Sequence, residues 1–419
     1  MADITHVGPV APLPLARGRI RAGFTMLGPA FVASVAYVDP GNFATNIQSG
    51  AQYGYLLLWV VLAANLMAML VQYLSAKLGS VTGRNLPEQV RERFPRPVTW
   101  GMWLQAEVMA MATDIAEFLG AAIGLNLLFG IALLPAGLIT GVISFAILGL
   151  QARGRRRFEL AIIALLGLVT VGFLYETLRI GPSTPGSLRG LVPGLDGVGS
   201  LYLAAGILGA TVMPHVIYLH SDLTKPLAPC RDGRERSRVL AFQRLDVLTA
   251  LGLAGLVNMA MLAVAARAFH TPALSNVATI GQAHAELSRV VGGVAALAFA
   301  VALLASGVSS SSVGTYAGQV VMAGFTGLHV PLPIRRGITM LPALTILATG
   351  TSPTSALVLS QVVLSFGIPF ALVPLVLLTS QSGVMGGHVN RRATTISAWA
   401  CAAVIIALNV LMLSQQFAG

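Results

Sequence analysis

Long apolar runs separated by short polar segments make up the chain from about residue 24 onward. Most runs reach roughly 20 residues, the length that an α-helix needs to cross the hydrocarbon core of a bilayer. We therefore expect an all-α integral membrane protein with eleven transmembrane helices, near residues 24–47, 54–78, 98–126, 132–150, 158–180, 198–223, 242–268, 290–322, 337–351, 354–379 and 394–415.

Two of these runs carry matching interruptions. "AYVDPGN" at 36–42 in the first run aligns with "ATVMPHV" at 210–216 in the sixth, and Asp39 matches Met213. Because five is odd, the second set of five helices starts from the opposite side of the membrane. The pattern predicts two inverted repeats, about 24–180 and 198–379, with an eleventh helix at 394–415. The alternative is a chance match between Ala- and Val-rich segments.

Composition and charge agree with a membrane protein. Only 10% of the residues are charged and the mean hydropathy is +0.79, whereas a soluble domain carries about 25% charged residues. With the N-terminus inside, 22 of the 26 Lys and Arg residues lie on the cytoplasmic side. This distribution predicts an N-in, C-out protein of the inner membrane, with a cytoplasmic tail at 1–23 and one transmembrane domain at 24–419. It explains the net charge of +11 without a nucleic-acid partner.

The prolines of the two interruptions indicate what the breaks provide. A proline removes the hydrogen bond to the carbonyl four residues earlier, which frees the carbonyl of Ala36 in the first span and that of Ala210 in the sixth. A free carbonyl in the middle of a membrane is costly unless it binds something. Interrupted spans at corresponding positions of inverted repeats indicate the substrate site of a transporter.

The side chains beside these carbonyls suit a cation. Asp39 offers a carboxylate, Asn42 an amide oxygen and Met213 a thioether. Anionic oxygen combined with soft sulfur favours a transition metal. The alternatives are that Asn42 only caps a half-helix and that Met213 only packs. An aspartate inside a membrane span is a functional candidate by default.

Acidic residues of the third span form a second group. Glu107, Asp114 and Glu117 lie at i, i+7 and i+10, on one stripe of the helix. Acids on one face of a membrane helix must line water or meet cations. Arg335 and Arg336, at the inner edge of the ninth span, are candidate partners, although they could simply anchor that helix at the membrane surface.

Two histidines follow the second interruption. His215 and His220 lie five residues apart in the sixth span. They are candidates for a proton relay, or else polar residues that are satisfied by their neighbours.

Asp-Pro-Gly-Asn in the first span and Met-Pro-His in the sixth resemble the paired signatures of the Nramp family of proton-coupled divalent metal transporters. The resemblance covers essentially the whole chain and is closest to the bacterial manganese transporters of that family. It implies a LeuT-like fold and the same metal ligands, and it adds Gln361 of the tenth span as a ligand in some states. It also implies that the acids of the third span and the arginines of the ninth form a proton exit route, in which Glu107 could be merely structural.

The sequence thus predicts a secondary transporter that imports Mn²⁺ or Fe²⁺, and also Cd²⁺ or Co²⁺, with protons. The alternatives are a sodium-coupled amino-acid transporter on the same fold and a passive cation channel. Repulsion between Asp39 and a substrate carboxylate disfavours the first, and an asymmetric site disfavours the second. Cys230 and Cys401 support neither a disulfide framework nor a thiolate site. We expect no enzyme activity, cofactor, ATP-binding loop or obligate protein partner.

Overall fold

The computed structural model describes residues 28–152, 155–230, 232–271, 279–328 and 330–418. The tail predicted at 1–23 and the first residues of the first predicted span lie outside the described residues.

Within the described residues the chain is helical. The helices are α2 (Pro29–Val35), η1 (Ala36–Val38), α3 (Pro40–Tyr53), α4 (Leu58–Thr82), α5 (Leu86–Arg93), α6 (Arg96–Phe129), α7 (Leu133–Ala152), α8 (Arg155–Ile180), α9 (Thr184–Gly190), α10 (Gly197–Thr211), α11 (Pro214–Leu223), η2 (Lys225–Leu227), α12 (Gly233–Phe269), α13 (Ile280–Val290), α14 (Gly293–Thr326), α15 (Leu332–Thr349), α16 (Pro353–Thr379), α17 (Ser382–Met385), η3 (Gly386–His388) and α18 (Arg392–Ala418).

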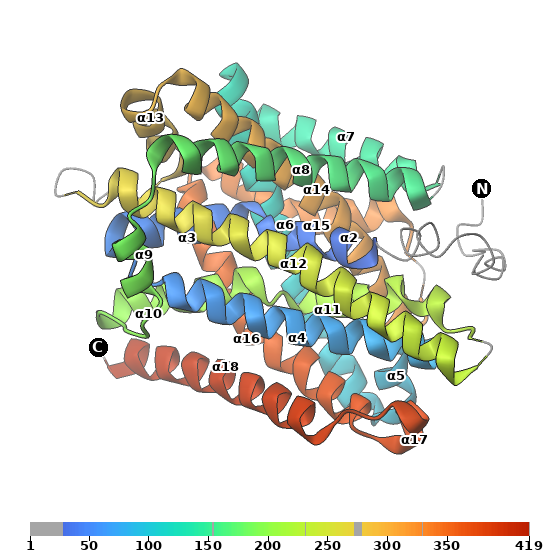
Figure 1. Ribbon diagram of the computed structural model, residues 1–419. Coiled ribbons are helices and arrows are strands. Elements are labelled where there is room, and N and C mark those ends of the chain that lie inside the picture. Colours follow the sequence, from blue (N-terminus) through green and yellow to red (C-terminus); the bar gives the residue numbers. More distant parts are fainter. Residues whose placement is uncertain (1–27, 153–154, 231, 272–278, 329, 419) are drawn as a thin grey trace.

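Each predicted span coincides with one helix or with consecutive helices. Eight of the described stretches are long and apolar enough to cross a membrane by length and composition. The all-helical membrane architecture is therefore confirmed, whereas the exact number of eleven crossings stays a prediction. Figure 1 shows the long helices side by side in one bundle, with α18 along one edge. Helices α5 and α17 lie at one end of the bundle, and α9 and α13 at the other.

Both interruptions are real breaks in a helix. In the first span, α2 and η1 end before Asp39, which is extended, and Pro40 begins α3. In the sixth span, α10 ends at Thr211, and α11 begins at Pro214 after the extended residue Met213. Proline suits the first position of a helix because it has no N–H to leave unpaired there. The two prolines therefore both end one half-helix and begin the next.

The packing of the long helices follows the predicted repeat. Helix α6, the third span, packs against α14 and α16, the eighth and tenth. In the predicted repeat the third span corresponds to the eighth, and the fifth to the tenth. The pair of α6 with α16 should therefore have a counterpart in α14 with α8, the fifth span, and these two helices do pack together. The repeat is thus visible in the helix contacts. The residue bounds of the two repeats stay predictions.

Small residues allow the central pair, α6 and α14, to approach closely. Gly124 of α6 lies against the backbone of Leu304, and Gly307 of α14 lies against that of Ala121. A side chain at either glycine would collide with the facing helix. Such contacts between small residues are typical of helix packing in membranes. They keep α6 and α14 close together beside the first break.

Candidate metal site

Asp39 sits at the first break and is completely buried. It is the N-cap of α3, and its Oδ1 accepts a hydrogen bond of 2.8 Å from the backbone N–H of Asn42. Its Oδ2 is buried and has no hydrogen-bond partner among the described residues. One oxygen thus stabilises the start of the helix, while the other is free to bind a cation.

The side-chain amide of Asn42 connects the two breaks. One of its terminal atoms lies 2.7 Å from Oδ1 of Asp39 and 3.2 Å from each of the carbonyl oxygens of Ala210 and Tyr37. With the nitrogen in this position, the amide donates hydrogen bonds to these oxygens. With its oxygen there instead, it would add a further acceptor to a cluster of oxygens, which only a cation could stabilise. The predicted residues Asp39, Asn42 and Ala210 therefore meet in one place.

The carbonyl of Tyr37 was not predicted as part of this cluster. Residues 36–38 form a 3₁₀ turn, and the turn places Tyr37, not Ala36, within hydrogen-bond distance of the Asn42 amide. The carbonyl of Tyr37 also accepts a bond of 2.6 Å from Nδ2 of Asn258. Counting four residues back from a proline cannot reveal this geometry. The predicted role of the Ala36 carbonyl stays a prediction.

Met213 occupies the corresponding position at the second break. It is fully buried and is the N-cap residue of α11, but its side chain makes no capping hydrogen bond. One turn earlier, the carbonyl of Ala210 faces Asn42. The thioether thus lies on the segment that completes the oxygen cluster, and it has no task in capping the helix.

Gln361 of α16 lies against both breaks. Its side-chain amide packs on Gly41, which leaves no room for a Cβ there, and its backbone carbonyl packs on Gly209 in the same way. Its Oε1 is buried without a hydrogen-bond partner among the described residues. The resemblance alone suggested this residue, and the structure places its side-chain amide against Gly41, two residues from Asp39.

The predicted acidic stripe of α6 meets the arginines of α15. Arg335 forms an ion pair of 2.9 Å with Glu107, and Arg336 forms one of 2.7 Å with Asp114. Arg336 is almost fully buried, and it also contacts the hydroxyl of Ser311. A buried arginine inside a bundle does not act as a surface anchor. The two arginines and two of the acids are therefore paired as the sequence suggested.

Glu117 lies between these ion pairs and the first break. Both of its oxygens are buried, and neither has a hydrogen-bond partner among the described residues. It lies one turn along α6 from Asp114, the partner of Arg336. One turn further along α6, Gly120 packs directly on Pro40. The stripe thus runs from the ion pairs to the break itself.

The two histidines of α11 have different neighbours. Nδ1 of His215 is 3.2 Å from the hydroxyl of Thr113, the neighbour of Asp114, and its Nε2 is buried without a partner among the described residues. Nδ1 of His220 is 2.8 Å from Gln72, whose amide donates to the hydroxyl of Tyr37. His215 therefore adjoins the acidic stripe, whereas His220 is a polar residue satisfied by Gln72.

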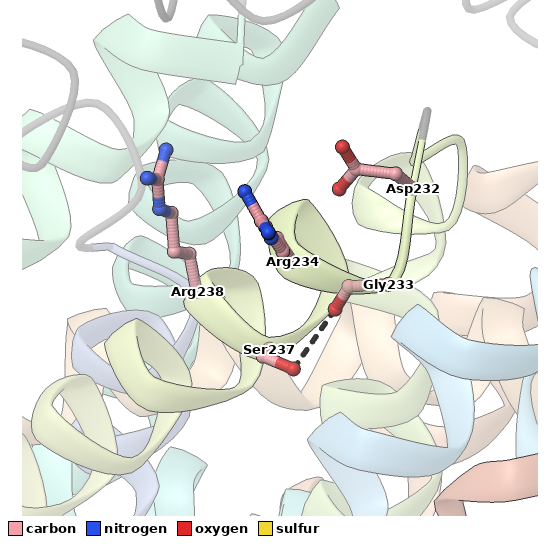
Figure 2. Close-up of a pocket in the computed structure, with 5 residues that line it drawn as sticks. All are labelled: Asp232, Gly233, Arg234, Ser237 and Arg238. Atoms are coloured by element: carbon pink, nitrogen blue, oxygen red, sulfur yellow. Dashed lines mark hydrogen bonds between the residues drawn. The ribbon is translucent and has the colours of Figure 1, made fainter.

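One open cavity is lined by none of the residues at the two breaks. This cavity, of about 670 Å³, is at the start of α12, where Arg234 and Arg238 point to the same side (Figure 2). Within the described ranges no cluster of three or more His, Cys, Asp or Glu side chains could hold a metal ion. The candidate site is instead a closed cradle of mixed ligands.

Comparisons with known proteins bear on this geometry. The family model described as "Natural resistance-associated macrophage protein-like", Nramp, matches residues 30–415. The divalent metal cation transporter MntH of Deinococcus radiodurans is 53% identical over 400 residues, which cover 96% of this chain and 92% of that protein. MntH of Bacillus subtilis is 49% identical over 405 residues, covering 96% and 95% of the two chains.

A solved structure agrees in fold. The manganese transporter of Eremococcus coleocola, in complex with an aromatic bis-isothiourea substituted compound, matches with a TM-score of 0.88 and 31% identity. The match covers 99% of this chain and 91% of that one. The LeuT-like arrangement expected from the broken first and sixth spans is thereby confirmed.

Proposed function

This chain belongs to the Nramp family of divalent metal transporters, and from that premise we propose that it imports Mn²⁺ or Fe²⁺ together with protons. The observation that carries the proposal is the meeting of Asp39, Asn42 and the carbonyl of Ala210 across two broken helices. The names of its relatives support transport of divalent metal and, for the Eremococcus protein, of manganese.

The mixed ligand set supports a transition metal as substrate. The carboxylate, amide and carbonyl groups supply hard oxygen ligands, and Met213 supplies soft sulfur. Mn²⁺ and Fe²⁺ accept both kinds of ligand, while Ca²⁺ and Mg²⁺ prefer oxygen. Cd²⁺ and Co²⁺ fit the same donors. The Asn42 amide would turn its oxygen toward a bound metal. When no metal is held, it would turn its nitrogen toward the carbonyls.

The stripe on α6 supports proton coupling. Glu117 links the vicinity of Asp39 to the pair formed by Asp114 and Arg336. A proton displaced from the first break would pass to Glu117 and then along Asp114 and Glu107 toward the end of α6 that begins at Arg96. His215 adjoins this route through Thr113.

The decisive experiment is metal-stimulated acidification of reconstituted vesicles. Purified protein is placed in liposomes that contain a pH-sensitive dye, and Mn²⁺, Ca²⁺ or a panel of amino acids is added outside. We expect Mn²⁺ to acidify the lumen and Ca²⁺ and the amino acids to have no effect. Acidification driven by an amino acid would favour the alternative symporter, and Mn²⁺ entry without acidification would remove the proton from the mechanism.

A further inference from the structure

One buried carboxylate in the bundle takes no part in the proposed metal site or proton route. Asp246 of α12 is 2% exposed. Its Oδ1 accepts a hydrogen bond of 3.2 Å from the N–H of Gly28, and its Oδ2 accepts one of 2.9 Å from the N–H of Ala30. These are the first N–H groups of α2, the half-helix that leads to the first break.

The sequence at the start of α2 makes such a partner necessary. The first N–H groups of a helix have no acceptor within the helix. Gly28 is the N-cap residue and has no side chain, and Pro29 contributes no N–H. Neither Gly28 nor Pro29 therefore caps this half-helix with a side chain. The carboxylate of Asp246 supplies the cap from another helix, and its charge is favourable at the positive end of the helix dipole.

Helix α12 also holds the far end of this segment. Asn258 lies twelve residues after Asp246, and it donates its 2.6 Å hydrogen bond to the carbonyl of Tyr37. At 1.5 Å per residue the two attachment points are about 18 Å apart along α12. One helix thus fixes both the start of α2 and the carbonyl that faces the Asn42 amide.

The attachment at the start of α2 is sparse. Among the described residues, the side-chain hydrogen bonds that join α2 to another helix are those of Asp246, because the hydroxyl of Ser34 bonds within α2. On the other side of Gly28 stands the carboxylate of Glu159 from α8, at 3.5 Å from where a Cβ would lie. Among the described residues, the side-chain hydrogen bonds at the start of this seven-residue helix thus come from one carboxylate, while the helix packs on α12, α8, α11 and α14.

We propose that Asp246 is a positioning residue that latches α2 against α12 and so sets how often the metal site opens. Asp39 and Asn42 are almost completely buried, so a bound ion can leave only when an element moves. Helix α2 is short and borders the break, and Asp246 caps its start. Release of Asp246 frees that start, and the segment up to Tyr37 then swings away from α12. The transport part of this inference rests on the proposed function.

A cysteine reporter tests the latch without any metal. Ser34 of α2 is fully buried, so Ser34→Cys in a chain with Cys230→Ser and Cys401→Ser is protected while α2 stays in place. The measurement is the rate of labelling by a charged maleimide added to the predicted cytoplasmic side. Asp246→Ala should raise that rate roughly tenfold, since a hydrogen bond to a charged acceptor is worth about a decade in equilibrium. Asp246→Asn, which keeps an acceptor oxygen, should raise it less.

Mn²⁺ uptake separates positioning from simple damage. Asp246→Ala and Asp246→Asn should raise the KM for Mn²⁺ in the same order as the labelling rate. A variant that only yields less folded protein lowers the maximal rate and leaves KM unchanged, and the labelling rate of its monodisperse folded fraction is unchanged as well. Thr249→Val, one turn along the same helix on an exposed side chain that bonds only within α12, is the matched control and should change neither.

Unchanged labelling in both Asp246 variants would overturn the latch. So would a labelling rate in the Thr249→Val control that rises as much as in Asp246→Ala. If Asp246→Ala does not fold, Asp246→Asn decides by the same two readouts. If the parent chain transports no Mn²⁺, the proposed function fails, but the labelling rates still support or refute the latch.

Discussion

The two broken spans share the frame Ala-x-Val-x-Pro, but their side chains complete it differently. At the first break Asp39 caps the next half-helix with one oxygen and keeps the other free. At the second break Met213 occupies the same position and caps nothing. The repeat therefore fixes where the backbone opens, and the side chains divide the chemistry. One break carries charge and holds its own helix, while the other contributes a carbonyl and sulfur.

This division makes the first break the more fragile. Asp39 serves both the start of α3 and the cation, so its removal affects folding and binding together. Met213 is free of any capping task, so a change there should act on the metal alone. The following changes test that contrast, from the largest expected effect on metal handling to the smallest.

Asp39→Ala should reduce Mn²⁺ uptake to background, because it removes the formal negative charge of the proposed site. It should also lower the free energy of unfolding by about 1 kcal/mol through the lost cap. The measurements are uptake into proteoliposomes and thermal unfolding in detergent. Asp196→Ala is the control, because this aspartate precedes α10 and its side chain makes no capping bond. Robust Mn²⁺ uptake by Asp39→Ala would refute the assignment of the site.

Acid should weaken metal binding through the first break and not through the second. A proton and the metal compete for the carboxylate of Asp39, whereas a thioether does not titrate. Affinity for Mn²⁺ should fall by up to about tenfold for each pH unit once protonation dominates. The measurement is a binding titration between about pH 5 and pH 8. Met213→Ala should keep the same pH dependence, and a flat titration of the parent chain would contradict the competition.

Met213→Ala should change selectivity more than rate. Ca²⁺ and Mg²⁺ gain almost nothing from sulfur, so a position given to methionine penalises them more than Mn²⁺, Fe²⁺ or Cd²⁺. The substitution opens that position to water, which suits the hard cations. Mn²⁺ transport should survive in weakened form, Cd²⁺ should lose most, and Ca²⁺ should become a better competitor.

Radiometal uptake with excess Ca²⁺ measures this change in the parent chain and in Met213→Ala. Met259→Ala, at a partly buried packing position on α12, is the control for loss of a methionine. Unchanged discrimination against Ca²⁺ in Met213→Ala would mean that the geometry of the oxygens, not sulfur, sets the selectivity.

The sequence predicted the breaks because proline acts locally. Pro40 and Pro214 end helices wherever they stand in an apolar run, and the two frames could be aligned by eye. The meeting of Asn42 with the Ala210 carbonyl followed from the inverted repeat. The number of membrane crossings was harder, because a short helix such as α15 and a broken one such as α2 fall below the length and hydropathy of a full span.

Contacts that depend on tertiary structure escaped the sequence. The choice of the Tyr37 carbonyl depends on a 3₁₀ turn, and the cap of α2 comes from Asp246, more than 200 residues away. Buried polar residues such as Asn258 and Asp246 in an apolar helix were the available signal. Their partners could not be identified, because helical periodicity gives the face of a residue but not the neighbour it meets. Gln361 likewise required a resemblance, since nothing near it in the sequence singles it out.

Asp114→Asn should have the smallest effect at the metal site and a large one on protons. Asp114 pairs with Arg336 at 2.7 Å on the α6 stripe, and it makes none of the contacts that join the two breaks. Mn²⁺ affinity should therefore stay within about threefold, the size of a loss well under 1 kcal/mol. Proton movement should slow or uncouple, because the neutral amide can no longer take a proton from Glu117, and Arg336 loses its partner.

The two quantities are measured on the same preparation, by Mn²⁺ binding and by metal-stimulated acidification. Glu286→Gln is the matched control, because that half-buried acid pairs with the exposed Arg289 of the same helix, α13, and should change neither quantity. If Asp114→Asn lost Mn²⁺ affinity as severely as Asp39→Ala, the stripe would be part of the metal site. The first break and α6 would then contribute to Mn²⁺ binding together, and the comparison would be between that combined site and the second break.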